Sequence, residues 1–326
     1  MKNLVILALG CALLAACRPD DVVECGPQAQ TLADLRAASP QTQLFVINPN
    51  QPQTVVTQGG ATLTIPPNRF YWPDGRLFSG QAVLRVREIY SVPDMLLADM
   101  PTNTTTGAGT REMLLSGGEF NLQLWQAGVR LRLLDLGPGS AAPPAPLVLT
   151  SPVPTAGLDT TRMLLWNQRF TALLAPGRDT AGWSAVLSSN YTPTSVPAST
   201  AGFYSAVLPL DSIGWWNIDQ FWHAYQSRTP VVVRVMVPGT TAAMPTKVYF
   251  RPIGYNGLAR CLPLLGTSSW EFPLPSGADV VAVVIQERGG RLYYGTQRVM
   301  AAAGLVLTPP LEALAAAEIV RRIRLL

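Results

Sequence analysis

The chain has 326 residues, of which 48% are hydrophobic and only 13% are charged, with a formal net charge of +4. This apolar content is enough for folded cores and argues against wholesale disorder. No basic run with interleaved aromatic residues occurs, which argues against a nucleic-acid partner. The 29 prolines and 27 glycines favour strands and turns over charged amphipathic helices.

The first residues predict a secretory signal peptide. Lys2 gives a positive start, and the apolar run from Leu4 to Leu14 is too short for a membrane span, which needs roughly 20 apolar residues. The run ends in Leu14-Ala15-Ala16-Cys17, which resembles the lipobox of bacterial lipoproteins. The resemblance implies that residues 1–16 are removed, and that acyl chains on Cys17 hold the protein at a membrane. An ordinary signal peptide with a chance cysteine is the alternative.

The residues after Cys17 predict where the anchor goes. Arg18 follows the cysteine, so the aspartate that retains some lipoproteins at the inner membrane is absent. The pair Asp20-Asp21 resembles an export signal of surface lipoproteins. We therefore expect a lipid-anchored outer-membrane protein, at the periplasmic face or the cell surface. Residues 17–44 are interpreted as the lipidated N-terminus and a polar tether.

Two cysteines remain once Cys11 is removed with the signal and Cys17 carries lipid. Cys25 and Cys261 would then lie in an oxidising compartment. They are candidates for a disulfide bond, and two free thiols are the alternative.

Alternating apolar and polar residues predict a first β-sandwich domain over residues 45–136. Strands are expected at Ala61–Ile65 and Ala82–Ile89. A further strand, Phe120–Leu124, is followed by the turn Gln126-Ala127-Gly128 and by Val129–Leu133, which predicts a hairpin. The residues expected to be buried in this hairpin are Phe120, Leu122, Leu124, Val129, Leu131 and Leu133.

Residues 136–157 are rich in proline and small residues, which predicts a domain boundary. We expect a second β-rich domain at 145–226 and a C-terminal β-sandwich at 228–308, with a hairpin turning at Gly289-Gly290. Residues 309–326 form the C-terminal segment, in which Leu311 to Ile323 have helical spacing. This helix is expected to pack on the last sheet; lying on a membrane is the alternative, because three arginines follow its apolar residues.

The fold class predicted from these patterns is mainly β. Tandem antiparallel β-sandwich units, with a short C-terminal helix, follow a cleaved lipoprotein signal peptide.

Two stretches resemble known families. Residues 59–70, GGATLTIPPNRF, and the strand from Val83 to Ile89 are similar to the β-sandwich module of ankyrins and netrin receptors. Gly117-Gly118-Glu119-Phe120 and the later run Gly214-Trp215-Trp216-Asn217-Ile218-Asp219-Gln220-Phe221 resemble a group of uncharacterised bacterial surface lipoproteins. Their motif is Gly-Trp-x-Asn-x-Asp-x-Phe, often with Cys and Arg where this chain has Ile218 and Gln220. The resemblance implies an architecture and no particular activity.

Residue types that carry catalysis are sparse. His223 is the one histidine, and we interpret it as structural. There is no Gly-x-Ser-x-Gly motif and no set of zinc ligands. Glu88, Asp94 and Asp99 are close in sequence, but their spacing fits no calcium loop, and Asp94 is expected to cap a turn or short helix. We therefore predict no catalytic residue, metal or cofactor, although a glycosidase pair distant in sequence stays open.

The aromatic cluster leaves two interpretations. Trp215, Trp216 and Trp222 are candidates for stacking on a sugar, or they form a buried core. The favoured function is a non-enzymatic lipoprotein that acts by scaffolding, adhesion or interaction with an envelope protein. A glycan-binding lipoprotein of a nutrient-uptake system is the alternative, and a hydrolase is the third hypothesis.

Overall fold

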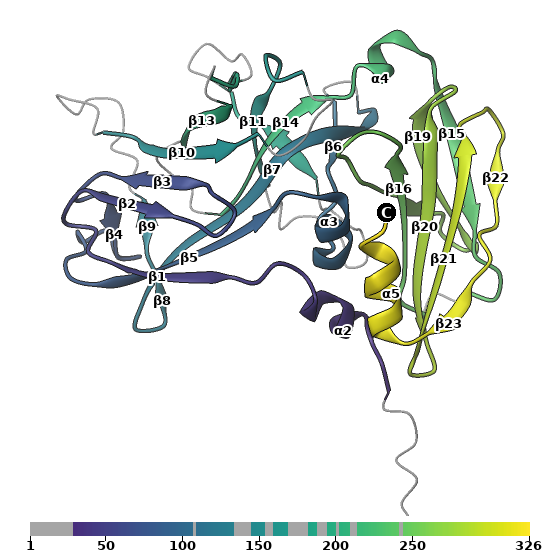
Figure 1. The fold of residues 1–326 in the computed structure, drawn as a ribbon, viewed down its shortest axis with the longest axis horizontal. Coiled ribbons are helices and arrows are strands. Elements are labelled where there is room, and N and C mark those ends of the chain that lie inside the picture. The colour runs from purple at the N-terminus through teal and green to yellow at the C-terminus, as the bar shows by residue number, and fades with distance from the viewer. Residues whose placement is uncertain are drawn as a thin grey trace, which may run out of the picture.

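The computed structural model describes residues 29–106, 109–133, 145–153, 159–168, 182–187, 194–199, 202–208, 214–240 and 244–326 (Figure 1). Within these ranges the protein is mainly β and ends in a short helix, which confirms the predicted fold class. No helix in the described ranges is both long and apolar enough to cross a membrane.

The first sandwich consists of two sheets. Sheet I has the order β1-β5-β7-β14-β11-β12-β6, with β8 beside β7, and sheet II has the order β13-β10-β3-β2. The strands of sheet I are β1 (Gln43–Ile47), β5 (Ala82–Ile89), β6 (Asn103–Thr105), β7 (Arg111–Gln126), β8 (Val129–Arg130), β11 (Leu164–Gln168), β12 (Trp183–Ala185) and β14 (Trp215–Phe221). Those of sheet II are β2 (Gln53–Val56), β3 (Thr62–Ile65), β10 (Leu147–Pro152) and β13 (Phe203–Leu208). A small pair, β4 (Phe70–Tyr71) and β9 (Arg132–Leu133), lies beside them.

The strands of this sandwich come from both sides of the predicted boundary at residues 136–157. β10 and β13 pair with β3 and with each other, and β14 pairs with both β7 and β11. One apolar core lies between the two sheets and includes residues of both halves, such as Leu84, Phe120, Leu149 and Tyr204. The strand pairing therefore differs from the predicted division into 45–136 and 145–226. Several strand pairs of this sandwich, such as β3 with β10 and β7 with β14, join segments that are distant in sequence.

The hairpin of β7 and β8 turns at two residues with positive φ, Ala127 at 45° and Gly128 at 79°. Such a two-residue turn matches the twist of antiparallel strands. The prediction that Val129 is buried is wrong, since its side chain is 38% exposed. Only two residues pair in β8, after which the chain turns and Leu131 and Leu133 enter the core.

The C-terminal unit is a second sandwich. Sheet III has the order β18-β19-β15-β22 and sheet IV the order β17-β16-β20-β21-β23. Their strands are β15 (Pro230–Met236), β16 (Thr246–Pro252), β17 (Ala259–Arg260), β18 (Leu262–Pro263), β19 (Ser269–Pro275), β20 (Asp279–Arg288), β21 (Arg291–Met300), β22 (Val306–Leu307) and β23 (Glu312–Leu314). A second apolar core includes side chains of both sheets, such as Val235 and Phe272 of sheet III and Phe250 and Val284 of sheet IV. The hairpin at Gly289-Gly290, with φ of 57° and 69°, is confirmed.

Three helices pack together beside sheet IV: α2 (Leu32–Ala37), α3 (Val92–Ala98) and α5 (Ala316–Ile323). A fourth, α4 (Ala224–Ser227), is a single turn after β14. The predicted helix from Leu311 is too long, because Glu312–Leu314 pairs with β21 as a strand. Ile319 and Ile323 are fully buried, so the apolar residues of α5 face the protein.

The predicted tether is folded from its middle onward. The N–H of Gln30 donates to the carbonyl oxygen of Gly290 (3.0 Å), and the Gln30 side chain accepts from the N–H of Ala316 (2.8 Å). α2 then begins with a capping box between Thr31 and Asp34. The sequence around Leu32-Ala33-Asp34-Leu35 indicates one helix-like turn within the predicted tether, and α2 extends it to six residues, of which Leu35 is buried. Residues 17–28 lie outside the described ranges.

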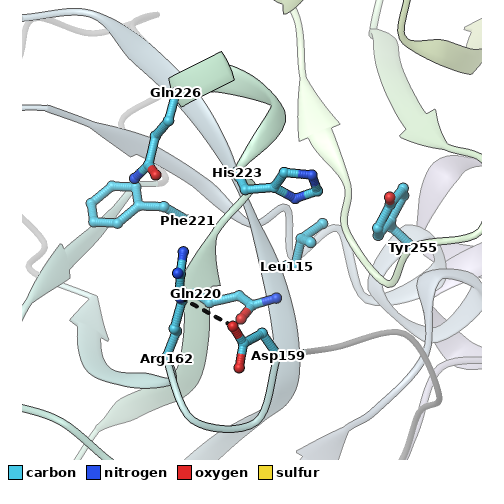
Figure 2. A pocket seen from close by; sticks show the side chains of 8 residues that line it. All are labelled: Leu115, Asp159, Arg162, Gln220, Phe221, His223, Gln226 and Tyr255. Atoms are coloured by element: carbon cyan, nitrogen blue, oxygen red, sulfur yellow. Dashed lines mark ion pairs between the residues drawn. The ribbon is translucent and has the colours of Figure 1, made fainter. Parts of the chain in front are cut away.

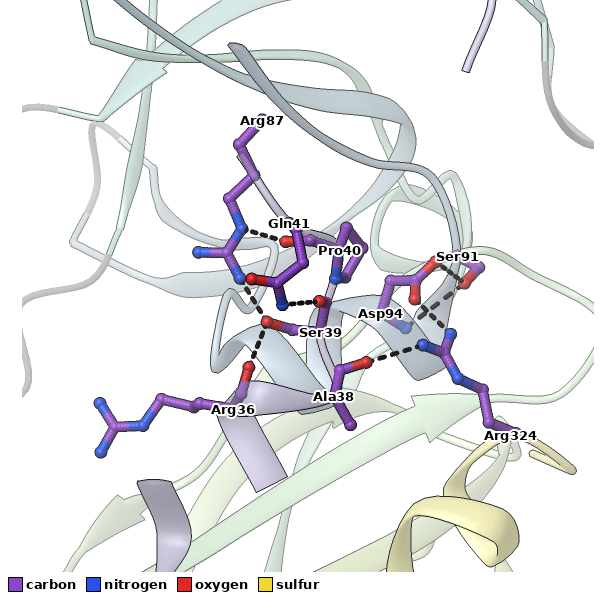
Figure 3. Close-up of polar contacts among 9 residues, drawn as sticks. All are labelled: Arg36, Ala38, Ser39, Pro40, Gln41, Arg87, Ser91, Asp94 and Arg324. Carbon is purple, nitrogen blue, oxygen red and sulfur yellow. Dashed lines mark hydrogen bonds and ion pairs between the residues drawn. The ribbon is translucent and has the colours of Figure 1, made fainter. Parts of the chain in front are cut away.

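Polar contacts fix the segment between α2 and β1 (Figure 3). The guanidinium of Arg87 donates to the carbonyl oxygen of Pro40 (2.8 Å) and to the hydroxyl of Ser39 (2.6 Å). From the C-terminal helix, Arg324 donates to the carbonyl oxygen of Ala38 (3.1 Å) and pairs with Asp94. The N-terminal and C-terminal segments are therefore joined directly to α3 and sheet I.

A polar seam joins the two sandwiches. The N–H of Thr102 donates to the carbonyl oxygen of Leu258 (2.7 Å), and Asn103 exchanges two hydrogen bonds with the backbone of Arg260 (2.7 and 2.9 Å). The Arg260 guanidinium also forms an ion pair with Asp99, which ends α3 with a φ of 58°. Because these groups are buried or half-buried, we interpret the seam as a structural contact that holds the two sandwiches together.

Candidate functional site

The motif strand β14 lies in the middle of sheet I, between β7 and β11. Its register with β7 shifts between Asn217 and Asp219, where β7 has two consecutive glycines. A Cβ on Gly117 would lie 2.8 Å from the Tyr204 ring and 3.0 Å from the carbonyl oxygen of Ile218. Gly118 has a φ of 144°, which L side chains rarely adopt. The glycines therefore permit the bulge that directs the polar residues of the motif.

A buried polar cluster follows from this geometry: Ser116 and Glu119 on β7, and Asn217 and Asp219 on β14. All four side chains are fully buried. The Ser116 hydroxyl donates to Asn217 Oδ1 (2.9 Å), and Asn217 Nδ2 donates to Asp219 Oδ2 (2.5 Å). Both carboxylate oxygens of Glu119 and the Oδ1 of Asp219 have no hydrogen-bond partner among the described residues.

Burial decides the charge of the two acids in this cluster. Loss of solvent raises the pKa of Glu119 well above its ordinary value, and the nearby Asp219 raises it further, while Arg87 acts in the opposite direction. Desolvation also raises the pKa of Asp219 well above its ordinary value, against the effect of its hydrogen bond with Ser116. Burial therefore shifts both acids toward their protonated forms.

The three tryptophans of the aromatic cluster do not form an exposed platform. Trp216 is buried in the core between sheets I and II, and Trp222 in the core of the C-terminal unit, where it contacts Tyr225 and Tyr255 edge-on or tilted. Trp215 is half-buried, and the guanidinium of Arg87 lies 5.9 Å from its ring centre. These positions favour the buried-core interpretation over stacking on a sugar.

The end of β14 forms one wall of a cavity of about 430 Å³ (Figure 2). With its amide oriented to satisfy both groups, Gln220 donates to the carbonyl oxygen of Asp159 (2.8 Å) and accepts from its N–H (3.2 Å). Gln220 thus fixes the short turn at Asp159. The residues that line the cavity are Leu115, Asp159, Arg162, Gln220, Phe221, His223, Gln226 and Tyr255.

The turn opposite His223 is held by its own contacts. Asp159 accepts from the N–H (3.2 Å) and the hydroxyl (2.6 Å) of Thr161, and it pairs with Arg162 (3.1 Å). These hydrogen bonds from Thr161 lower the pKa of Asp159. Arg162, His223 and Gln226 are exposed, so they offer hydrogen-bonding groups at the rim of the cavity.

The chemistry of this cavity is that of binding by hydrogen bonds. Its volume lies in the range of small-molecule sites, about 300–1,000 Å³. Asp159 is the one carboxylate in its lining, whereas Glu119 and Asp219 lie inside the sheet. The arrangement expected of a glycosidase, two carboxylates facing each other across a cleft, is thus not the one that these described residues form.

The remaining predicted site residues lie apart from one another. Glu88 accepts from the Thr57 hydroxyl (2.6 Å) inside the first unit, and Asp99 lies in the seam. The prediction that Asp94 caps a helix is wrong, because Ser91 is the N-cap of α3 and accepts from the N–H of Asp94, which lies in the first turn and accepts from the Ser91 hydroxyl (2.7 Å). Among the described residues, no group of three or more acidic, histidine or cysteine side chains is placed to hold a metal.

The cysteines are only partly described. Cys261 is buried in the core of the C-terminal unit and forms no disulfide bond with a described cysteine, and burial raises the pKa of its thiol well above the ordinary value. Cys17 and Cys25 lie outside the described residues, so lipidation and the Cys25–Cys261 bond stay predictions.

Sequence reasoning missed the residues that contact the motif from elsewhere. In the sequence, Glu119 belongs to the Gly117-Gly118-Glu119-Phe120 resemblance. An acid that follows Gly117-Gly118 within an otherwise apolar strand also indicates that its side chain is buried. Asp159, Arg162 and Tyr255 gave no local signal, since they reach the cavity from other segments.

Comparison with known proteins adds no relative. The chain matches no known protein-family model, and no curated protein is similar to it in sequence. The resemblance of the motif to surface lipoproteins therefore stays a prediction.

Proposed function

We propose that the protein is a lipid-anchored envelope lipoprotein that acts through contacts of its surface, without catalysis. The observation that carries this proposal is the tetrapeptide Leu14-Ala15-Ala16-Cys17, placed after an apolar run of signal-peptide length. The expected location is the outer membrane, at its periplasmic face or at the cell surface.

The attachment of α2 supports a body that stays near its anchor. The chain from Cys17 to Ala29 is twelve peptide units long, and it spans at most about 43 Å when fully extended. From Gln30 onward the chain is bonded to the C-terminal unit, through Gly290, Ala316 and Glu287. An acylated Cys17 would thus hold both sandwiches within a short distance of the bilayer.

The positions of the acidic and aromatic side chains support a binding role for the protein over catalysis of a reaction. The acids of the motif are buried, and Trp216 and Trp222 lie in the cores. Recognition of a glycan by these rings is the less supported alternative, because stacking on a sugar requires an exposed face. An envelope protein is the partner that we favour.

The anchor is tested by labelling cells with an alkyne analogue of palmitate. Wild type and Cys25→Ala should be labelled and should sediment with outer membranes, whereas Cys17→Ala should lose the label. Protease treatment of intact cells then separates the surface from the periplasmic face. Equal labelling of Cys17→Ala and wild type, or an unlabelled wild type, would overturn the proposal.

A further inference from the structure

The outer face of sheet I is exposed at its β1 edge. Leu44 and Val46 of β1 point away from the core and are 66% and 70% exposed. β1 pairs with β5 on one side, and no described strand lies on its other side. Two large aliphatic side chains this exposed on one short strand are unusual for a surface that faces only water.

The strand register extends this surface across three neighbouring strands. Val46 lies opposite Val83, Val83 opposite Trp125, and Trp125 opposite Arg130. In the next row Leu44 lies opposite Arg85, whose guanidinium is 4.9 Å from the centre of the Trp125 ring. We call this surface the β1 face, and its members are Leu44, Val46, Val83, Arg85, Trp125 and Arg130.

The charge of the β1 face has one sign. Arg85 and Arg130 are exposed, and none of its six members is acidic. The outer face of sheet II provides a contrast within the same sandwich. It also exposes apolar side chains, Val56 at 62%, Phe203 at 39% and Val207 at 54%, but its exposed neighbours on β3 and β13, such as Thr64 and Ser205, are uncharged.

The position of the β1 face relates it to the N-terminus. β1 follows α2 after five residues, and Arg87 bonds the intervening segment to β5. In Figure 1, β1, the β7–β8 hairpin, α2 and the first described residues lie along the lower side of the molecule, whereas sheet II lies above β1 and β5. The twelve-unit chain that ends at Cys17 starts from this same side.

We propose that the β1 face rests on the lipid bilayer and binds anionic headgroups. Exposed aliphatic side chains enter the interface between headgroups and acyl chains, and tryptophan is enriched at that depth. Arginine donates paired hydrogen bonds to phosphate, and an anionic surface attracts basic residues that lie close to it. The orientation rests on the proposed lipid anchor, because the short chain from Cys17 brings this side toward the membrane.

Fluorescent probes at two exposed valines test the contact. Val46→Cys and Val207→Cys, each with Cys25→Ser, carry an environment-sensitive dye in the acylated protein, which is reconstituted in vesicles of phosphatidylethanolamine and phosphatidylglycerol. Brominated lipid should quench the dye at position 46 at least threefold more than the dye at position 207. Arg85→Gln, or replacement of phosphatidylglycerol by phosphatidylcholine, should reduce the quenching at position 46 about twofold.

The outcomes separate the face from the anchor. Failure of the wild type to float with vesicles would contradict the anchor. Flotation with equal, weak quenching at positions 46 and 207 would overturn the β1 face while leaving the anchor intact. Protection of position 46 without quenching, together with crosslinking between copies through that cysteine, would assign the β1 edge to self-association and would also overturn this proposal.

Discussion

The carboxyl groups of Glu119 and Asp219 link the stability of the first sandwich to pH. Their pKa values in the folded protein lie above those of the unfolded chain, because burial disfavours the charged form. Below about pH 4 both states hold the protons and stability is complete. As the pH rises, the unfolded chain loses its protons first, so the free energy of unfolding falls by up to about 1.4 kcal/mol per pH unit for each group.

Glu119→Gln should remove one of these two contributions. We expect the variant to resemble wild type near pH 4 and to lose less stability than wild type between pH 5 and pH 8, as measured by urea unfolding. Asp74→Asn is the control, because hydrogen bonds with Arg76 lower the pKa of Asp74, so its effect has the opposite sign. Parallel pH profiles of wild type and Glu119→Gln would contradict the prediction.

Gly257 lies where the C-terminal unit closely approaches the backbone of β7 beside the seam. A Cβ there would lie 2.6 Å from the carbonyl oxygen of Leu114, a backbone atom that cannot rotate away. Gly257→Ala should therefore lower the free energy of unfolding by about 1–3 kcal/mol. Gly214→Ala is the matched control, because its Cβ would meet only the end of Arg130, at 3.9 Å. Equal thermal midpoints for the two variants would contradict the prediction, because they would show that the backbone around Gly257 accommodates the added methyl group.

At the scale of elements, α3 and β17 are joined by the ion pair of Asp99 and Arg260. Arg260 is buried, desolvation lowers its pKa to about 10, and Tyr249 and Lys247 also contact Asp99. Neutralising Asp99 removes the carboxylate that forms an ion pair with this buried positive charge.

Asp99→Asn should therefore destabilise the protein by about 3 kcal/mol. Asparagine tolerates the left-handed backbone at position 99, so the loss reports charge and not strain. Glu271→Gln, which removes the partner of the half-exposed Arg234, should cost less than about 1 kcal/mol. Denaturant unfolding of both variants provides the comparison, and equal losses would contradict a buried role for the Asp99 pair.

Local patterns in the sequence predicted where strands and turns occur better than they predicted which strands pair. Both predicted hairpins occur, because two turn residues between alternating strands act over a few residues. The strand Ala82–Ile89 has the predicted bounds. By contrast, β23 was predicted as the start of a helix, since its residues have helical spacing and only its pairing with β21 makes it a strand.

The candidate site was predictable only where its residues are adjacent in sequence. The motif strand was visible, but its interpretation depended on whether its tryptophans are buried, and burial is decided by strands far away. Asp99 and Arg260 are 161 residues apart, so no periodicity connects them. The pairing of strands across residues 136–157 was not predictable for the same reason, since composition marks loops and does not identify which strands pair across them.

At the scale of the whole molecule, the first sandwich needs strands from both halves of the chain. A chain of residues 29–136 would contain β1 to β9 but would lack β10, the partner of β3, and β14, the partner of β7. We expect it to show no cooperative thermal transition by circular dichroism and to be digested rapidly by protease, whereas residues 29–326 resist. A cooperative transition of the short chain would show that the predicted unit 45–136 folds alone.

The late arrival of β14 has a consequence for synthesis. β7 ends at Gln126 and its neighbour β14 begins at Trp215, about 90 residues later. During synthesis, the edge of β7 that pairs with β14 therefore stays without this partner until about two thirds of the chain has been made. Such distant pairings slow folding and expose the edge to other chains. A chaperone that shields β7 during this interval should therefore raise the yield of folded protein more than one that acts after release.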